Sequence, residues 1–277
     1  MDAPLNQVFF PVSFHELFSA WNRFPDAVPY AGGTNLIGRQ ENNENYIPPV
    51  FLCLDKLEEL QHITRTEHYL EIGSMIKLSR LLRLGKIVPK IFCVCLENIA
   101  GVQVRNTATI GGNICSVSHL FDLPAVLTAL DAQYELRGAH SVRWVSASRF
   151  HSNEERGVLA KQELLTRIRL PLLQWDYSIY KKFNGEDMFN SEVIVFLAKA
   201  QKNILSEIRV VYKENTILRN KDGEDILTGK RLPLSRRTAD DFVENWKEFL
   251  AKRQDVSDFS KNALLNNIEE NVYNLSE

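Results

Sequence analysis

The chain has 277 residues, 44% of them hydrophobic and 25% charged, which is ordinary for a globular protein and excludes a mainly disordered, collagenous or coiled-coil chain. This length corresponds to one large domain or two modest ones. The formal net charge is -2 and no long basic run stands out, so a nucleic-acid-binding surface has little support.

The first residues, MDAPLNQVFFPVSF, contain no positively charged region ahead of an apolar stretch, so they do not resemble a signal peptide. The longest apolar runs are far shorter than a bilayer span. We therefore expect a soluble cytoplasmic protein that makes no membrane contact. The four cysteines form no C-x-x-C pair and predict buried free thiols, with no iron–sulfur ligand pattern on this chain.

The N-terminal half begins with a capping box. Ser13 and Glu16 precede apolar residues at helical spacing, which predicts an amphipathic helix that ends before Pro25. A short strand is predicted over 27–31, and a longer helix over 90–100.

Residues 102–121 show no helical period and are rich in small polar side chains, so we expect an irregular segment there. Asp122 follows as the predicted N-cap of the next helix. A half-buried strand over 164–171 precedes further strand-like segments, and two helices with Thr238 and Ser260 as predicted caps end the chain. The result is a mixed α+β organisation.

Two glycine pairs are candidate binding elements. One lies in AGGTN at 31–35, directly after a predicted strand, and the other in TIGGN at 109–113, within the irregular segment. Paired glycines allow positive φ and let successive amide groups line an anion-binding concavity. Each pair alone is more often a plain turn, and neither matches a dinucleotide or P-loop fingerprint. Two glycine hairpins that converge in space would suit a diphosphate-containing cofactor.

Other polar residues allow two interpretations. Asp122 is more often a plain helix cap, but its carboxylate could also contact a sugar hydroxyl. Lys181 and Lys182 lie in a predicted strand, where an exposed edge is the ordinary role. The sequence has no H-E-x-x-H or G-x-S-x-G motif, so hydrolase and metalloenzyme functions have no candidate residues.

Taken in order, three segments resemble the FAD-binding (medium) subunit of the molybdenum hydroxylases, the family of xanthine dehydrogenase and carbon monoxide dehydrogenase. They are YAGGTNL at 30–36, VRNTATIGGNIC at 104–115 and DLPAVLTALDA at 122–132. The resemblance covers nearly the whole chain and includes LTGKRL at 227–232. It implies an α+β fold: an FAD-binding domain over 1–171, built of two subdomains as in the vanillyl-alcohol-oxidase flavoproteins, and a small α+β C-terminal domain over 172–277.

The resemblance also implies roles for individual residues. Residues 28–35 would wrap the FAD diphosphate, and 109–113 would hold the diphosphate and the flavin side. Ser116 and Asp122 would contact the ribityl or diphosphate region, Ile99 would lie near the adenine, and Leu165 and Lys181 would approach the flavin ring. The implied cofactor-binding residues are Val28, Pro29, Tyr30, Ala31, Gly32, Gly33, Thr34, Asn35, Ile99, Thr109, Ile110, Gly111, Gly112, Asn113, Ser116, Asp122, Leu165 and Lys181.

Lys181 is preferred to Lys182 because it keeps the better spacing to Met188 and Val193. A lysine near the ring would favour the reduced, anionic flavin by charge attraction. No catalytic acid–base pair and no metal site is implied on this chain, because the flavin itself performs the redox chemistry.

The implied function is electron transfer within a heteromeric complex. FAD on this chain would take electrons from [2Fe–2S] clusters on an iron–sulfur small subunit, next to a molybdopterin-binding large subunit, and NAD or another acceptor would reoxidise it. The sequence departs from the family pattern at Asn35, where an aspartate is common, and at 183–186, which lacks the usual arginine pair. Two alternatives remain: a non-catalytic assembly subunit that has lost FAD, and a stand-alone flavin oxidoreductase.

Overall fold

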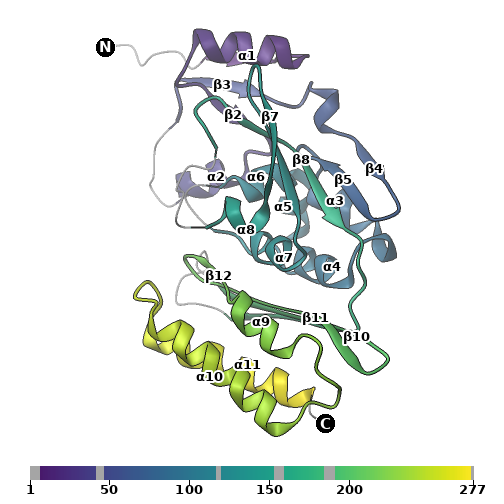
Figure 1. Cartoon of the computed structure of the whole chain (residues 1–277). Helices are drawn as coiled ribbons and strands as arrows, with labels where there is room; N and C mark the ends of the chain where they lie inside the picture. Colours follow the sequence, from purple (N-terminus) through teal and green to yellow (C-terminus); the bar gives the residue numbers. More distant parts are fainter. Residues whose placement is uncertain (1–6, 42–46, 117–119, 153–158, 184–190, 276–277) are drawn as a thin grey trace.

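The computed structural model describes residues 7–41, 47–116, 120–152, 159–183 and 191–275, and the described residues form three sheets (Figure 1). The first sheet is parallel, with strand order β1-β3-β2. Helix α1 packs on it through an apolar face, and Ser13 caps it as predicted, its Oγ accepting from the Glu16 amide. The Glu16 side chain accepts from the Val12 amide, one residue before the Ser13 amide that a full capping box would use. The elements are β1 (Gln7–Phe9), α1 (Phe14–Arg23), β2 (Val28–Tyr30) and β3 (Val50–Cys53).

The second sheet is antiparallel, with strand order β4-β5-β8-β6-β7, and its inner face packs against short helices. The register between β6 and β8 shifts between Glu135 and Leu136, and Thr166 is the residue passed over. Leu165 therefore joins the inner core with Ile168, although simple alternation would place the two on opposite faces. The strands are β4 (Ile63–Arg65), β5 (Tyr69–Gly73), β6 (Gln133–Arg137), β7 (Val142–Ser146) and β8 (Leu164–Pro171).

Helices cover the inner face of this sheet, and two of them correct the prediction of an irregular segment after residue 101. That segment contains α5 (Val102–Thr107) and α6 (Ile110–Ile114). Each has only five or six residues, which is too short to show a helical period in the sequence. The remaining short elements of this part are η1 (Glu58–Leu60), α3 (Leu78–Leu82), η2 (Gly85–Ile87), α4 (Lys90–Glu97), α7 (Leu123–Ala129) and α8 (Ala147–Phe150).

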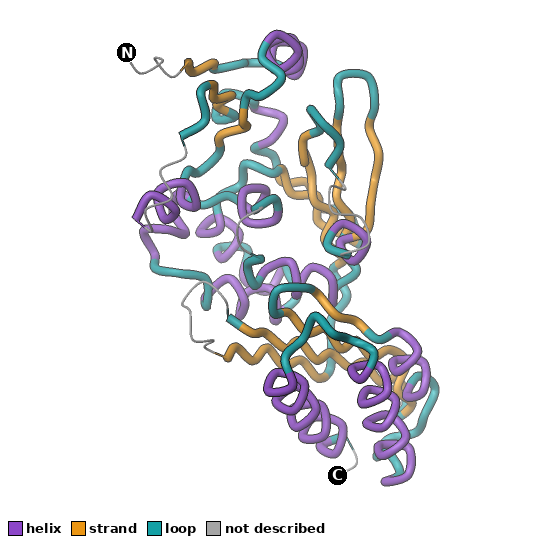
Figure 2. The backbone as a smooth tube through the Cα atoms, turned by 90° about the vertical axis from the view of Figure 1, so that its left-hand side faces the viewer, coloured by secondary structure: helices purple, strands orange, loops and turns teal. Residues whose placement is uncertain are grey.

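The third sheet is antiparallel, with strand order β12-β11-β10-β9, and it lies between two layers of helix (Figures 1 and 2). Successive residues of β10 point to opposite faces. Val193, Val195 and Leu197 join the core that includes α7, whereas Ile194 and Phe196 join the core beneath the C-terminal helices. The elements are β9 (Tyr177–Phe183), β10 (Glu192–Gln201), β11 (Ile204–Lys213), β12 (Ile217–Arg219), α9 (Lys221–Leu227), α10 (Arg236–Ala251) and α11 (Asp258–Asn274).

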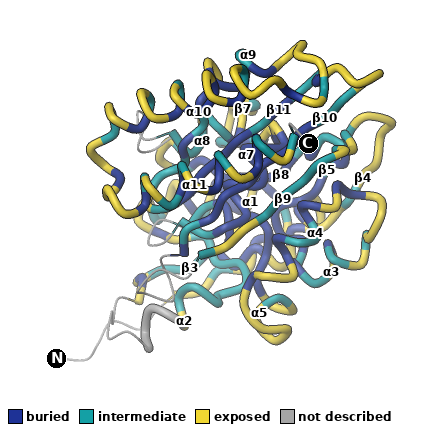
Figure 3. Tube along the Cα trace, turned by 90° about the horizontal axis from the view of Figure 1, so that it is seen from below, coloured by how far each residue is buried: buried dark blue, intermediate teal, exposed yellow. Residues whose placement is uncertain are grey.

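The two C-terminal helices start one turn earlier than predicted. Ser235 caps α10 by accepting from the Thr238 amide at 3.2 Å, and Ser257 caps α11 by accepting from the Ser260 amide at 3.1 Å. Both starts carry hydroxyl residues three positions apart, and apolar periodicity does not show which one is the cap. The outward turns of α10 and α11 are exposed, while the residues beneath them are buried (Figure 3). No helix in the described part of the chain is long and apolar enough to span a membrane.

Candidate functional site

The two glycine pairs lie against each other, as predicted. A Cβ placed on Gly32 would lie 2.2 Å from the Thr107 carbonyl oxygen, and one on Gly112 would lie 4.0 Å from the Ala31 Cβ. Gly32 therefore lets the chain that leads into the second glycine segment pass directly over the first. Only a residue without a side chain fits at this contact, because real Cβ atoms do not approach so closely.

The glycine pairs open helices and do not form the predicted hairpins. Gly33 has φ +68°, a left-handed value, and α2 (Thr34–Glu41) begins at the next residue. Thr109 caps α6 by accepting from the Gly112 amide at 3.0 Å, so the second pair lies in the first turn of that helix. The first amide groups of a helix have no partner within it, so those that open α2 can face an anion. In α6 the first amides are already engaged, because Ile110 donates to the Ile76 carbonyl, Gly111 to the Ser74 carbonyl and Gly112 to the Thr109 side chain.

Asn35 and Ser116 connect the two glycine segments directly. The Asn35 Nδ2 atom donates to the Ser116 Oγ atom at 3.2 Å, although the residues are 81 positions apart. Both belong to the set implied by the resemblance. The substitution of Asn for the common aspartate at position 35 is therefore compatible with a neutral hydrogen bond between the segments.

Two buried polar atoms next to the second pair have no hydrogen-bond partner among the described residues: Asn113 Oδ1 and Ser74 Oγ. Ser74 lies against Gly111, whose amide donates to the Ser74 carbonyl at 2.9 Å and whose added Cβ would be 2.7 Å from the Ser74 Cβ. An unsatisfied buried polar group costs about 1–3 kcal/mol, and a polar ligand or a water molecule can supply the missing partner. A lone serine after a strand gives no sequence signal, so Ser74 was not predicted.

Asp122 does not act as the predicted N-cap. Its backbone is helical, with φ -75° and ψ -33°, and its side chain makes no capping bond. The carboxylate instead accepts three hydrogen bonds from the third sheet: Ser191 Oγ at 2.7 Å, Lys182 Nζ at 2.7 Å and Tyr180 OH at 3.2 Å. These bonds withdraw the carboxylate from the helix start and tie α7 to β9 and the start of β10.

The two neighbouring lysines point in opposite directions because they alternate on β9. Lys181 faces α11 and lies 3.5 Å from Glu270 Oε2, half exposed, so the structure does not bring it towards Asp122. Lys182 faces α7 and binds Asp122. Ile179 and Phe183 share the face of Lys181 and pack against the core beneath the helices. The expected role of Lys181 at the flavin ring stays a prediction.

The surroundings of Asp122 are largely dry. Burial raises the pKa of Tyr180 well above its usual range, and the neighbouring Cys95 and Asp122 raise it further, so its hydroxyl keeps its proton and donates. Burial also raises the pKa of the Cys95 thiol. The predicted residues Leu165 and Ile99 are buried in the same core, whereas Val28 is partly exposed at the edge of the first sheet.

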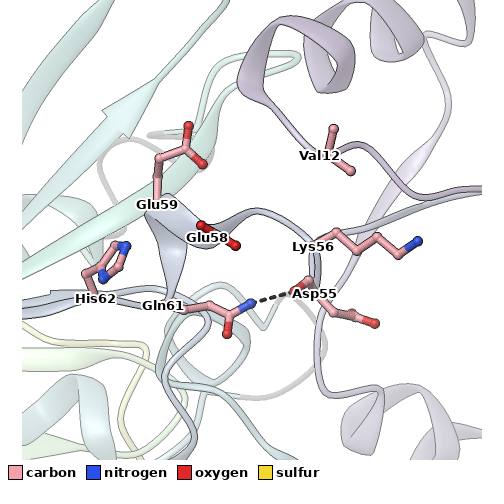
Figure 4. Close-up of a pocket in the computed structure, with 7 residues that line it drawn as sticks. All are labelled: Val12, Asp55, Lys56, Glu58, Glu59, Gln61 and His62. Carbon is pink, nitrogen blue, oxygen red and sulfur yellow. Dashed lines mark hydrogen bonds between the residues drawn. The ribbon is translucent and has the colours of Figure 1, made fainter.

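A separate hollow lies near η1 and the segment before α1 (Figure 4). It has a volume of about 680 Å³, contains no residue of either glycine segment, and has Gln61 donating to the Asp55 carbonyl on its wall. Its lining residues are Val12, Asp55, Lys56, Glu58, Glu59, Gln61 and His62. The described residues contain no cluster of three or more His, Cys, Asp or Glu side chains suited to a metal ion.

Comparison with known proteins decides the family. The profile described as the FAD binding domain in molybdopterin dehydrogenase matches residues 4–173. The chain belongs to this family. The predicted membership of the family of FAD-binding domains of the xanthine and carbon monoxide dehydrogenases is therefore confirmed.

Individual relatives differ in length. The chain is 28% identical over 240 residues to the xanthine dehydrogenase FAD-binding subunit of Escherichia coli O157:H7, covering 83% of this chain and 80% of that one. It is 30% identical over 187 residues to the glyceraldehyde dehydrogenase medium chain of Sulfolobus acidocaldarius, covering 66% of each. Against xanthine dehydrogenase 2 of Arabidopsis thaliana it is 29% identical over 241 residues, 79% of this chain but only 18% of that protein.

Solved structures share the fold over the full chain. The Cu,Mo-CO dehydrogenase matches with a TM-score of 0.83 at 22% identity, covering 100% of this chain and 99% of that one. Quinoline 2-oxidoreductase from Pseudomonas putida 86 matches with a TM-score of 0.79 at 21% identity, covering 100% and 97%. The predicted mixture of helices and several sheets is thereby confirmed.

Proposed function

We propose that the chain is the FAD-carrying electron-transfer subunit of a heteromeric molybdenum hydroxylase resembling xanthine dehydrogenase. The observation that carries this proposal is the contact between the two glycine segments beside two buried polar atoms that lack partners, Asn113 Oδ1 and Ser74 Oγ. In the proposed complex an iron–sulfur small subunit supplies electrons from [2Fe–2S] clusters. A molybdopterin-binding large subunit generates them, and NAD or another acceptor receives them.

The residues around the glycine contact fit a dinucleotide. Amide groups of 32–35 would hold the diphosphate at the start of α2. Residues 109–113 would contact the diphosphate and the flavin side through side chains and close backbone packing, because the amides of 110–113 already donate within the protein. Hydroxyl groups of the cofactor would form hydrogen bonds with Asn113, Ser74 and Ser116. Ile99 would lie near the adenine. Val28, Pro29, Tyr30, Thr109 and Ile110 stay in the proposed set as walls of the same site.

The flavin supplies the redox chemistry when bound, and the chain binds and orients it. Leu165 would exclude water from one side of the ring. Asp122 would present its carboxylate at the ribityl or diphosphate region while Lys182 holds it. Lys181 stays the proposed lysine near the flavin ring on the strength of the resemblance, and we propose Lys182 as a second lysine of the site, because it shares the face of β9 that meets α7.

We further propose that the FAD-binding domain spans 1–171, with a C-terminal domain over 172–277. The end of β8 at Pro171, the start of β9 at Tyr177 and the end of the family match at residue 173 support this boundary. Division of the first domain into two subdomains, as in vanillyl-alcohol-oxidase flavoproteins, is supported by its separate cores around Leu52 and Ile72.

Addition of FAD to the purified chain tests the proposal. After removal of free cofactor, we expect bound flavin absorbance at about one FAD per chain, and Asn113→Ala should weaken binding by roughly tenfold for a lost hydrogen bond in a buried site. A folded chain that binds the partner subunits but no FAD would instead support the assembly-subunit alternative. Reduction of the bound flavin by NADH without any partner would support the stand-alone alternative.

The stretch at 183–186 bears on these alternatives because it lacks the family's arginine pair. Residues 184–190, which include Met188, lie outside the described part of the chain, so the proposal rests on the glycine segments alone. The cytoplasmic location likewise stays a prediction from the sequence.

A further inference from the structure

Lys213, the last residue of β11, is a buried cation for which the sequence analysis gave no role. Its side chain is 1% exposed. The Nζ atom donates to the Ser191 carbonyl at 2.6 Å and lies 3.6 Å from Asp122 Oδ1. Burial of an ammonium group is unfavourable unless it is paired and hydrogen-bonded, so both contacts stabilise it.

Two ammonium groups share the Asp122 carboxylate. Lys182 binds one oxygen, while Lys213 approaches the other, to which Ser191 Oγ also donates. The next acid, Glu192, is already occupied by the hydroxyl groups of Tyr212 at 2.6 Å and Ser260 at 3.0 Å. By themselves Asp122, Lys182 and Lys213 carry an excess of one positive charge, which the neighbouring Glu192 and Glu214 oppose electrostatically.

This group lies where the two halves of the protein meet. Asp122 directly precedes α7, which packs on one side against α6 with the second glycine pair and on the other side against β10 and β11 (Figure 1). Burial lowers the pKa of Lys213, Lys182 lowers it further, and Asp122 and Glu192 oppose both effects. A charge in such a poorly solvated place acts over a longer distance than a surface charge, because water does not screen it.

We propose that Lys213 is a positioning residue of the flavin site: it holds Asp122 and Ser191 in place and supplies a buried positive charge that favours reduced flavin. When the flavin ring of FAD gains two electrons and one proton, the ring becomes a singly charged anion, which the Lys213 charge attracts. The inference rests on the proposed function, namely that FAD binds beside Asp122. It adds a residue that does not itself contact the cofactor.

Anaerobic titration of the FAD-loaded chain with dithionite and reference dyes measures the effect. We expect Lys213→Gln, which keeps a donor but removes the charge, to disfavour reduced flavin about tenfold, a fall of about 30 mV in the two-electron potential. Asp122→Asn should shift the potential upwards, and the double variant should return close to the wild-type value. Lys221→Gln, which removes an exposed charge on α9, is the matched control and should leave the potential unchanged.

The return of the potential in the double variant distinguishes the proposal from a merely structural role of Lys213. If Lys213→Gln weakens FAD binding or folding and leaves the potential unchanged, the inference is wrong while the proposed function stands. Should Lys213→Gln fail to fold, the nearly isosteric Asp122→Asn decides alone, and an unchanged or lower potential overturns the inference. A folded wild-type chain that binds no FAD overturns the proposed function and the inference together.

Discussion

Lys182 and Asp122 join the two halves of the protein, with the Lys182 Nζ atom 2.7 Å from the Asp122 Oδ2 atom. The opposite end of α7 is held in the same way, because Asp131 accepts from Arg209 at 3.0 Å and from Arg219. Cations of the third sheet thus bind α7 at both ends. The apolar core between α7 and the strands β10 and β11 lies between these two contacts.

Removal of the Lys182 charge should destabilise the protein. Lys182→Met leaves the buried Asp122 carboxylate without its closest cation, so we expect the free energy of unfolding to fall by about 1–3 kcal/mol in urea denaturation. Lys181→Met is the matched control, since its exposed pair with Glu270 contributes less than about 1 kcal/mol. Equal losses for the two variants would contradict the contact between β9 and α7.

The other end of α7 should be more sensitive. Arg219 binds Glu224 through two nitrogens, and both side chains are less than a tenth exposed. Arg219→Met leaves the buried Glu224 carboxylate without its cation, so we expect a loss of about 3–5 kcal/mol in the free energy of unfolding. Arg253→Met breaks a more exposed pair with Asp255 and serves as the control for thermal unfolding. A loss no larger than that of the control would show that the Arg219 contacts do not form.

The contact at Gly32 should not tolerate a methyl group. Gly32→Ala forces the Thr107 carbonyl away, so we expect a loss of about 1–3 kcal/mol in stability together with weaker FAD binding. In Gly101→Ala the nearest atom is the flexible Gln103 side chain at 3.3 Å, and little change is expected. Calorimetric FAD titration of both variants checks the result; unchanged affinity in Gly32→Ala would separate the glycine contact from cofactor binding.

Acid should destabilise the second-sheet core through His151. Burial lowers the pKa of His151 from its ordinary value of about 6.5 to about 3, and its Nε2 atom lies 3.3 Å from the Tyr134 hydroxyl. Because the folded pKa lies below the unfolded one, stability is present above about pH 6.5 and falls as the pH drops towards the folded value. Between about pH 7 and pH 4, we expect the free energy of unfolding of the wild type to fall by about 2–3 kcal/mol more than that of His151→Gln. If the free energy of unfolding falls equally with pH in the two proteins, protonation of His151 does not cause the acid destabilisation.

The sequence predicts the main elements of the N-terminal half well because their signals are local. The capping-box pattern at Ser13 and the apolar spacing that follows suffice to predict α1. The two glycine pairs and their order along the chain suffice to indicate the family. The helices α5 and α6 escape prediction because five or six residues cannot display a period. The caps of α10 and α11 were misplaced because Ser235 and Ser257 each have a second hydroxyl residue three positions later.

The polar contacts of the site depend on tertiary structure. Nothing local to Asp122 reveals that Ser191 and Lys182, some 60 to 70 positions later, occupy its carboxylate. Ser74 becomes relevant only because β5 ends against Gly111. Lys213 follows an apolar run in the sequence, and only the packing of β11 against α7 shows that its charge is buried.

A crystal structure of the chain with bound FAD tests the central claim most directly. We predict that the diphosphate contacts amide groups of 32–35, that residues 109–113 line the same site, and that Asn113 Oδ1 and Ser74 Oγ gain hydrogen-bond partners. FAD bound elsewhere, with both of these atoms still unpartnered and the glycine segments in contact only with protein, would contradict it.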